Sequence, residues 1–109
     1  MFTAAAWGSL YKVSGTVADT DGGPLPGALY RIYAPSDSVM PVVSNVTDSL
    51  GRFSQPLDSA GNYSLNVEYL GMKPAVRLFS LSTEQHETRL DSIILSSDEA
   101  TLSELVVTY

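Results

Sequence analysis

The stretch "GNYSLNVEYLG", residues 61–71, contains the strongest strand pattern in the chain. Bulky apolar side chains occupy every second position, at Tyr63, Leu65, Val67 and Tyr69, and polar side chains lie between most of them. Because successive side chains of a strand point to opposite faces, this spacing predicts a strand with one face buried and the other in water. Glycines at both ends of the stretch indicate turns there.

Similar strand signals, separated by turn residues, recur about every ten residues along the chain. They lie at residues 10–19, 28–34, 39–48, 75–81 and 88–95. The signal at 39–48 contains Pro41, which cannot donate to a ladder, so we expect that strand at the periphery. No window has helical periodicity over the ten or more residues that a helix needs. The pattern predicts an all-β sandwich of about seven strands.

Turn residues between these signals have specific structural uses. We expect "TDGGPLPG", residues 20–27, to turn the chain between two strands. We interpret "TDSLGRF", residues 47–53, as a hairpin corner, in which Asp48 caps the turn and Gly51 adopts a positive φ. Gly15 lies inside a predicted strand, where a glycine leaves room for a close neighbour or a bend.

Composition excludes several classes of function. With 109 residues and 44% hydrophobic residues, the chain is long and apolar enough for one globular domain. The net charge of −6 would repel phosphate backbones, so we expect no nucleic-acid partner. Eight of the twelve acids lie in residues 56–109, which favours a basic partner for that half. The absence of cysteine excludes disulfides and thiolate chemistry.

The chain also lacks the residue patterns of an active site or a cofactor site. The single histidine, His86, lies in the polar run 82–88, and no G-x-S-x-G motif is present. Asp19, Asp21 and Asp48 lie in or near turns, where aspartate usually hydrogen-bonds its own backbone rather than a calcium ion. We therefore predict a protein without catalytic activity, metal or cofactor.

The chain divides into three parts. Residues 1–10 read as a flexible leader, residues 11–96 as the sandwich, and residues 97–109 as an acidic linker followed by a strand-forming end. No stretch approaches the ~20 apolar residues of a membrane-spanning helix.

Several motifs, in order along the chain, resemble the carboxypeptidase-regulatory-like domain family. They are Val13-x-Gly15-x-Val17-x-Asp19, Pro24-Leu25-Pro26-Gly27-Ala28, Thr47-Asp48-x-x-Gly51-x-Phe53 and Gly61-x-Tyr63-x-Leu65. The version resembled is the N-terminal domain of TonB-dependent outer-membrane receptors of Bacteroidetes-type bacteria. The resemblance implies an immunoglobulin-like or transthyretin-like β-sandwich on the periplasmic face of the outer membrane. We interpret the motif residues as scaffold.

The end of the chain resembles the TonB box that often follows this domain. The matching residues of this closing segment, residues 102–108, are Leu102, Glu104, Leu105, Val106, Val107 and Thr108. Leu105 replaces the commoner valine. The resemblance implies that the C-terminal domain of TonB captures an extended peptide by strand addition, and that a receptor plug and barrel follow.

Alternatives remain open for the closing segment and for the domain. The closing segment could instead be the last strand of its own sandwich, or it could pair with a neighbouring copy. A second hypothesis for function is a structural, adhesive or glycan-binding module of a secreted or surface protein. A third is a regulatory domain attached to a peptidase whose chemistry lies elsewhere.

Overall fold

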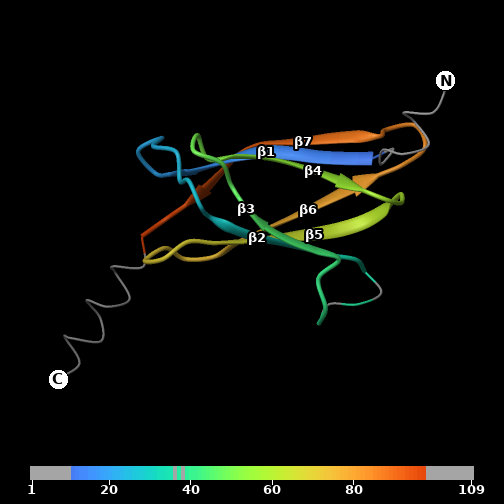
Figure 1. The fold of residues 1–109 in the computed structure, drawn as a ribbon, viewed down its shortest axis with the longest axis horizontal. Helices are drawn as coiled ribbons and strands as arrows, with labels where there is room; N and C mark the ends of the chain where they lie inside the picture. The colour runs from blue at the N-terminus through green and yellow to red at the C-terminus, as the bar shows by residue number, and fades with distance from the viewer. Residues whose placement is uncertain (1–10, 36, 38, 98–109) are drawn as a thin grey trace.

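The computed structural model describes residues 11–35, 37 and 39–97, and these residues form seven β-strands without an α-helix (Figure 1). The strands are β1 (Tyr11–Asp19), β2 (Leu29–Tyr33), β3 (Val43–Val46), β4 (Arg52–Leu57), β5 (Gly61–Glu68), β6 (Ala75–Leu81) and β7 (Glu87–Leu95). The predicted all-β fold of about seven strands is confirmed.

The strands form two sheets that pack face to face (Figure 1). One has the order β4-β1-β7 and the other the order β3-β2-β5-β6. Only β2–β3 and β5–β6 are hairpins between consecutive strands, so the chain passes from sheet to sheet at its other four connections. β7 pairs with β1 in parallel, whereas the remaining pairs are antiparallel.

The alternation that predicts β5 agrees with its position in the core. Tyr63, Leu65 and Val67 point inward and are buried, whereas Glu68 is exposed. The strand ends at Glu68 because a turn follows, in which the Met72 N–H donates to the Tyr69 carbonyl over 2.9 Å. The buried residues that form the core are Val13, Val17, Leu25, Ala28, Tyr30, Ile32, Phe53, Leu57, Tyr63, Leu65, Val67, Phe79, Leu81, Ile93 and Leu95.

The peripheral position predicted for the strand in residues 39–48 is confirmed, since β3 lies at the edge of its sheet. The strand begins only at Val43, however, so Pro41 precedes it and is not part of its ladder. The interpretation of residues 47–53 as a hairpin corner is wrong. The chain does turn there, but β3 pairs with β2 and β4 pairs with β1, so the strands on either side lie in opposite sheets. Local turn bonds are the same in both arrangements, and only the distant partners differ.

Candidate functional site

Most of the turn motifs meet at one end of the sandwich, and the first of them is built on Asp19. Its Oδ1 accepts hydrogen bonds from the N–H groups of Asp21, at 2.9 Å, and Gly23, at 2.8 Å. The Asp19 N–H donates to the Gly23 carbonyl over 2.9 Å. The carboxylate therefore closes its own turn, as an aspartate in this position was expected to do.

Thr47 connects the motif at residues 24–28 to the motif at residues 47–53. It is a polar residue, and it is buried. Its hydroxyl donates to the Leu25 carbonyl over 2.7 Å and accepts from the Ala28 N–H over 2.9 Å. Its backbone N–H donates to the Ala28 carbonyl, and its carbonyl accepts from the Gly27 N–H. These four bonds hold the turn at residues 24–28 against the end of β3. Because the buried Thr47 hydroxyl both donates and accepts a hydrogen bond, its two bonds offset the cost of removing it from water.

Gly51 lies where three backbone segments come together. Its φ is +72°, and a Cβ added there would lie 2.6 Å from the Val17 carbonyl oxygen and 2.9 Å from the Leu25 nitrogen. Pro24 also approaches that point, at 3.2 Å, and forms an isolated bridge with Ala18. Pro24 and Pro26 are both exposed, and Leu25 between them is buried. Only glycine fits position 51, for reasons of both conformation and space.

Asp48 fixes the same turn from the solvent side. Its Oδ1 accepts from the N–H groups of Leu50 and Arg52, both at 2.9 Å, and its Oδ2 lies 3.4 Å from Arg52 Nε. The hydrogen bonds from the backbone of Arg52 and Leu50 lower the pKa of the Asp48 carboxyl. Asp48 and Gly51 thus act as the sequence predicted.

We expect Asp48→Asn to change how stability depends on pH. Because the pKa is lower in the folded chain than in the unfolded chain, the charged carboxylate stabilises the fold above the unfolded value of about 3.9. That contribution is lost as the pH falls through the folded-state pKa. The wild-type advantage over Asp48→Asn in urea unfolding should therefore be present at about pH 6 and shrink below about pH 4. If wild type and Asp48→Asn differ in stability by the same amount at both pH values, the pKa of Asp48 is not lowered by folding.

Gly15 and Phe53 contact each other in the core. A Cβ on Gly15 would lie 3.0 Å from two atoms of the Phe53 ring and 3.3 Å from the Asp91 carbonyl oxygen. Phe53 also packs against Tyr30, with ring centroids 4.9 Å apart. The Tyr30 hydroxyl donates to Gln55 Oε1 over 2.9 Å, which links the two sheets, and burial raises the pKa of Tyr30. Gly15 therefore leaves room for a close neighbour, and that neighbour is Phe53.

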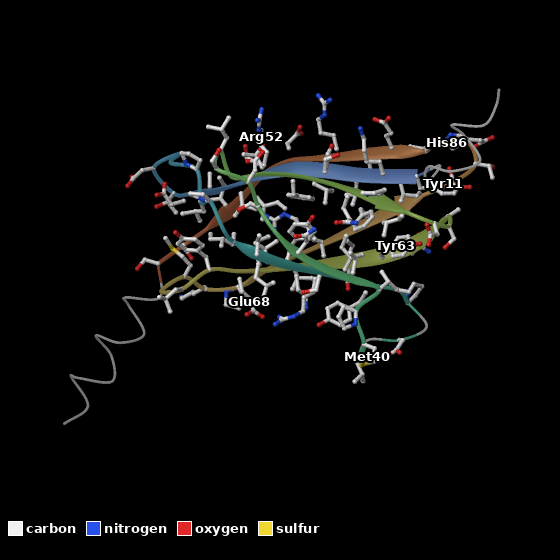
Figure 2. The ribbon with its side chains drawn as sticks, in the orientation of Figure 1. Tyr11, Met40, Arg52, Tyr63, Glu68 and His86 are labelled. Carbon is white, nitrogen blue, oxygen red and sulfur yellow. The ribbon has the colours of Figure 1, made fainter. Side chains whose placement is uncertain are left out.

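The fourth motif lies around Tyr63, where the chain enters β5 (Figure 2). The Tyr63 hydroxyl donates to the Ser59 carbonyl over 2.7 Å, and the ring stacks on Phe79 at 5.4 Å. A tyrosine that bonds back to the chain a few residues upstream is a recurrent brace in sandwiches. Gly61, two residues earlier, has a φ of +154°.

An open groove of about 920 Å³ is lined by residues of all three strands of the β4-β1-β7 sheet and by Tyr30, Asn45 and Val46 of β2 and β3 in the other sheet. The side chains that the three-stranded sheet contributes include Ser14, Thr16, Arg52, Ser54, Arg89 and Ser92, and the lining also contains the carboxylates of Asp48 and Asp91. The strand register places Ser54 beside Ser14 and Ser14 beside Arg89, so hydroxyl and guanidinium groups form cross-strand rows. Such a lining can both donate hydrogen bonds to polar groups and accept them, and its two carboxylates balance its two guanidinium groups. The sequence reading missed it, although these residues occupy outward positions of their strands.

The histidine lies elsewhere. His86 packs edge-on against the ring of Tyr11, with centroids 5.4 Å apart, at the end of the sandwich away from Arg52 (Figure 2). It does not line the groove. Within the part of the chain that the structure describes, no group of three or more His, Cys, Asp or Glu side chains is placed to hold a metal ion.

These turns and strands match a known family. The model of the carboxypeptidase regulatory-like domain matches residues 12–96. The chain belongs to this family. The carboxypeptidase regulatory-like domain thus ends, by this match, one residue after the last residue of β7. The comparison with curated proteins gives no match.

Solved structures share the fold of this carboxypeptidase regulatory-like domain. The major pilin subunit BcpA of Bacillus cereus has a TM-score of 0.65 and 14% identity, over 83% of this chain and 31% of the pilin. The 5-hydroxyisourate hydrolase of Klebsiella pneumoniae has a TM-score of 0.59 and 19% identity, over 84% of this chain and 91% of the hydrolase. A chlorocatechol 1,2-dioxygenase from Pseudomonas putida has a TM-score of 0.58 and 13% identity, over 82% of this chain and 61% of the dioxygenase.

At these identities the likeness shows the sandwich fold alone, and the predicted immunoglobulin-like or transthyretin-like class is confirmed. The chain spans less than a third of the pilin subunit. The residues that the sequence assigned to a partner, 102–108, lie outside the described residues. No helix in the described ranges has the length and apolar character to cross a membrane.

Proposed function

We propose that this carboxypeptidase regulatory-like domain is a non-catalytic interaction module of a TonB-dependent outer-membrane nutrient receptor. It would work at the periplasmic face of the outer membrane and present residues 102–108 to TonB. One observation supports this proposal above the others: the last described strand ends at Leu95 and the family match ends at residue 96. The seven described strands and the core that they form therefore precede the closing segment in the chain.

The chemistry of the closing segment suits strand addition. Leu105, Val106 and Val107 are strong strand formers, and their backbone N–H and C=O groups supply the bonds that such binding uses. The alternating side chains then provide specificity. Glu104 and the acids before it would favour a basic partner.

The non-catalytic part of the proposal is supported by what the motif residues do. The carboxylates of Asp19 and Asp48 are occupied by N–H groups of their own turns. The hydroxyls of Tyr30 and Tyr63 are bonded to Gln55 and to the Ser59 carbonyl. The side chains that identify the family thus brace the sandwich, and their hydrogen-bonding capacity is used there.

Titration calorimetry of the 109-residue chain with the C-terminal domain of TonB tests the proposal. We expect binding, and we expect at least one of the two variants Val106→Pro and Val107→Pro to weaken it roughly tenfold or more. Successive N–H groups of a strand face opposite edges, so one of these two N–H groups must bond the partner. Val106→Thr keeps the N–H and the strand propensity and should bind like the wild type. Absence of binding, or two proline variants that bind normally, would rule out strand addition.

The second candidate is a structural or adhesive module, and exposed apolar side chains on β6 favour it. Val76 and Leu78 point outward from the four-stranded sheet with 55% and 79% of their surface exposed. Among the proteins of similar fold is a major pilin subunit. A coding sequence that continues past Tyr109 without a plug and barrel would favour this candidate over the receptor.

A further inference from the structure

The two sheets have four edge strands, and three of them carry features that discourage pairing with another chain. β3 has only four residues and follows Pro41 closely. β4 contains Pro56. β7 has an irregular register with β1 between Arg89 and Ser92, and Asp91, between them, has a φ of +25°. Short length, proline, bulges and charge are the devices by which natural sheets protect their edges.

β6 carries only one of these features, the charge of Arg77, which lies opposite Leu65 in the ladder. It is seven residues long, contains no proline and pairs with β5 in unbroken register from Gly61↔Leu81 to Val67↔Ala75. Its one charged side chain is Arg77, and its outward side chains Val76 and Leu78 are largely exposed. A long, regular and apolar edge of this kind readily accepts a further strand.

The backbone of β6 is available over part of this edge. The Ser80 carbonyl accepts from the Thr88 hydroxyl of β7 over 2.7 Å, so the alternate residues Val76, Leu78 and Ser80 turn their backbone groups away from β5. The Val76 carbonyl is contacted by the guanidinium of Arg77, at 3.1 Å. The carbonyls of Val76 and Ser80 are therefore bonded by side chains, whereas no side chain or loop of the described residues bonds the backbone of Leu78 between them.

We infer that this edge of β6 accepts the closing segment, residues 102–108, of a second copy of the chain. That segment has seven residues, like β6, and includes the strand formers Val106, Val107 and Thr108. The charges are complementary. The three ion pairs between described residues use Lys12, Arg31 and Arg52, whereas Lys73 and Arg77 at β6, like Arg89 on β7, have no carboxylate partner there. The chain around the closing segment supplies Asp98, Glu99 and Glu104.

The direction of the chain favours a second copy over the same molecule. Ser97 bridges Met72 in antiparallel orientation, and the Lys73 N–H donates to the Ser96 carbonyl over 2.8 Å. At Ser97 the chain therefore runs opposite to the path from Met72 into β6. A contact between two different surfaces of identical copies is heterologous and can continue from copy to copy. This inference rests on β6 and does not depend on capture by TonB.

Sedimentation velocity of the full chain over a range of concentrations tests the inference. We expect self-association that Leu78→Lys weakens roughly tenfold or more, because a charge would enter the paired edge. The matched control is Val46→Lys on the opposite edge strand β3, where the side chain is 52% exposed. Both variants should melt like the wild type, since both side chains are exposed, and the control should associate normally.

A peptide of residues 98–109, added to the isotope-labelled full chain, identifies the acceptor by nuclear magnetic resonance. Its amide shifts should centre on β6, Arg77→Glu should weaken binding, and the same peptide carrying Glu104→Arg should bind Arg77→Glu better than the unaltered peptide does. A chain that stays monomeric at every concentration, equal losses with both lysine variants, or shifts outside β6 would each overturn the inference. Binding of the same peptide to TonB is a separate measurement, so either proposal can fail alone.

Discussion

Gly51→Ala is expected to lower the free energy of unfolding by about 2–4 kcal/mol. The residue has a φ of +72°, which disfavours any side chain. The new Cβ would also lie 2.6 Å from the Val17 carbonyl oxygen, a backbone atom that holds β1 to the turn. The Gly51 carbonyl accepts from the Val17 N–H over 2.7 Å, so any movement that relieves the clash strains this bond.

Gly27→Ala provides the matched control for this substitution. Gly27 has nearly the same φ, +75°, but no atom lies within 4 Å of the position that its Cβ would take. It should therefore show the conformational cost alone, about 1–2 kcal/mol. Urea unfolding of both variants, with equal m-values, separates the two contributions. If Gly51→Ala costs no more than Gly27→Ala, the three segments do not meet as tightly as described.

Leu65→Ala is expected to cost about 2–5 kcal/mol, because it removes a fully buried side chain and leaves a cavity. Leu65 lies in the middle of β5, between Ile32 of β2 and Arg77 of β6, and its side chain faces the opposite sheet. The cavity would open at the centre of the core, where rigid strands on both sides limit collapse.

The control for Leu65→Ala is Leu78→Ala on the adjacent strand. Leu78 is 79% exposed, so the same chemical change should alter stability by no more than about 0.5 kcal/mol. Thermal and urea unfolding of the two variants should therefore differ widely. Similar losses would mean that β5 does not place Leu65 inward, and the predicted alternation would be wrong.

Local rules explain what the sequence could predict. The alternation in residues 61–71 needs only the two-residue period of a strand, and β5 follows it. Asp48 and Gly51 form their turn through bonds and dihedral angles within five residues of chain. Each of these features is decided by near neighbours.

Features that depend on residues far apart in the chain could not be predicted from the sequence in this way. The corner at residues 47–53 has the same local bonds whether its strands pair or separate, so its passage between the sheets is decided by β1 and β2. Thr47 reads as an ordinary turn residue, and only the fold brings it against Leu25 and Ala28. The rows of hydroxyl and guanidinium groups in the groove likewise require the register of three strands.

The proposed presentation of the closing segment to TonB is tested most directly by backbone amide spectra of the full chain, recorded with and without the C-terminal domain of TonB. We predict changes at residues 102–108, with protection of alternate amides, while the amides of β1 to β7 keep their positions. Spectra that do not change at all, or changes that spread through the strands of the sandwich while residues 102–108 stay as they were, would contradict the proposal.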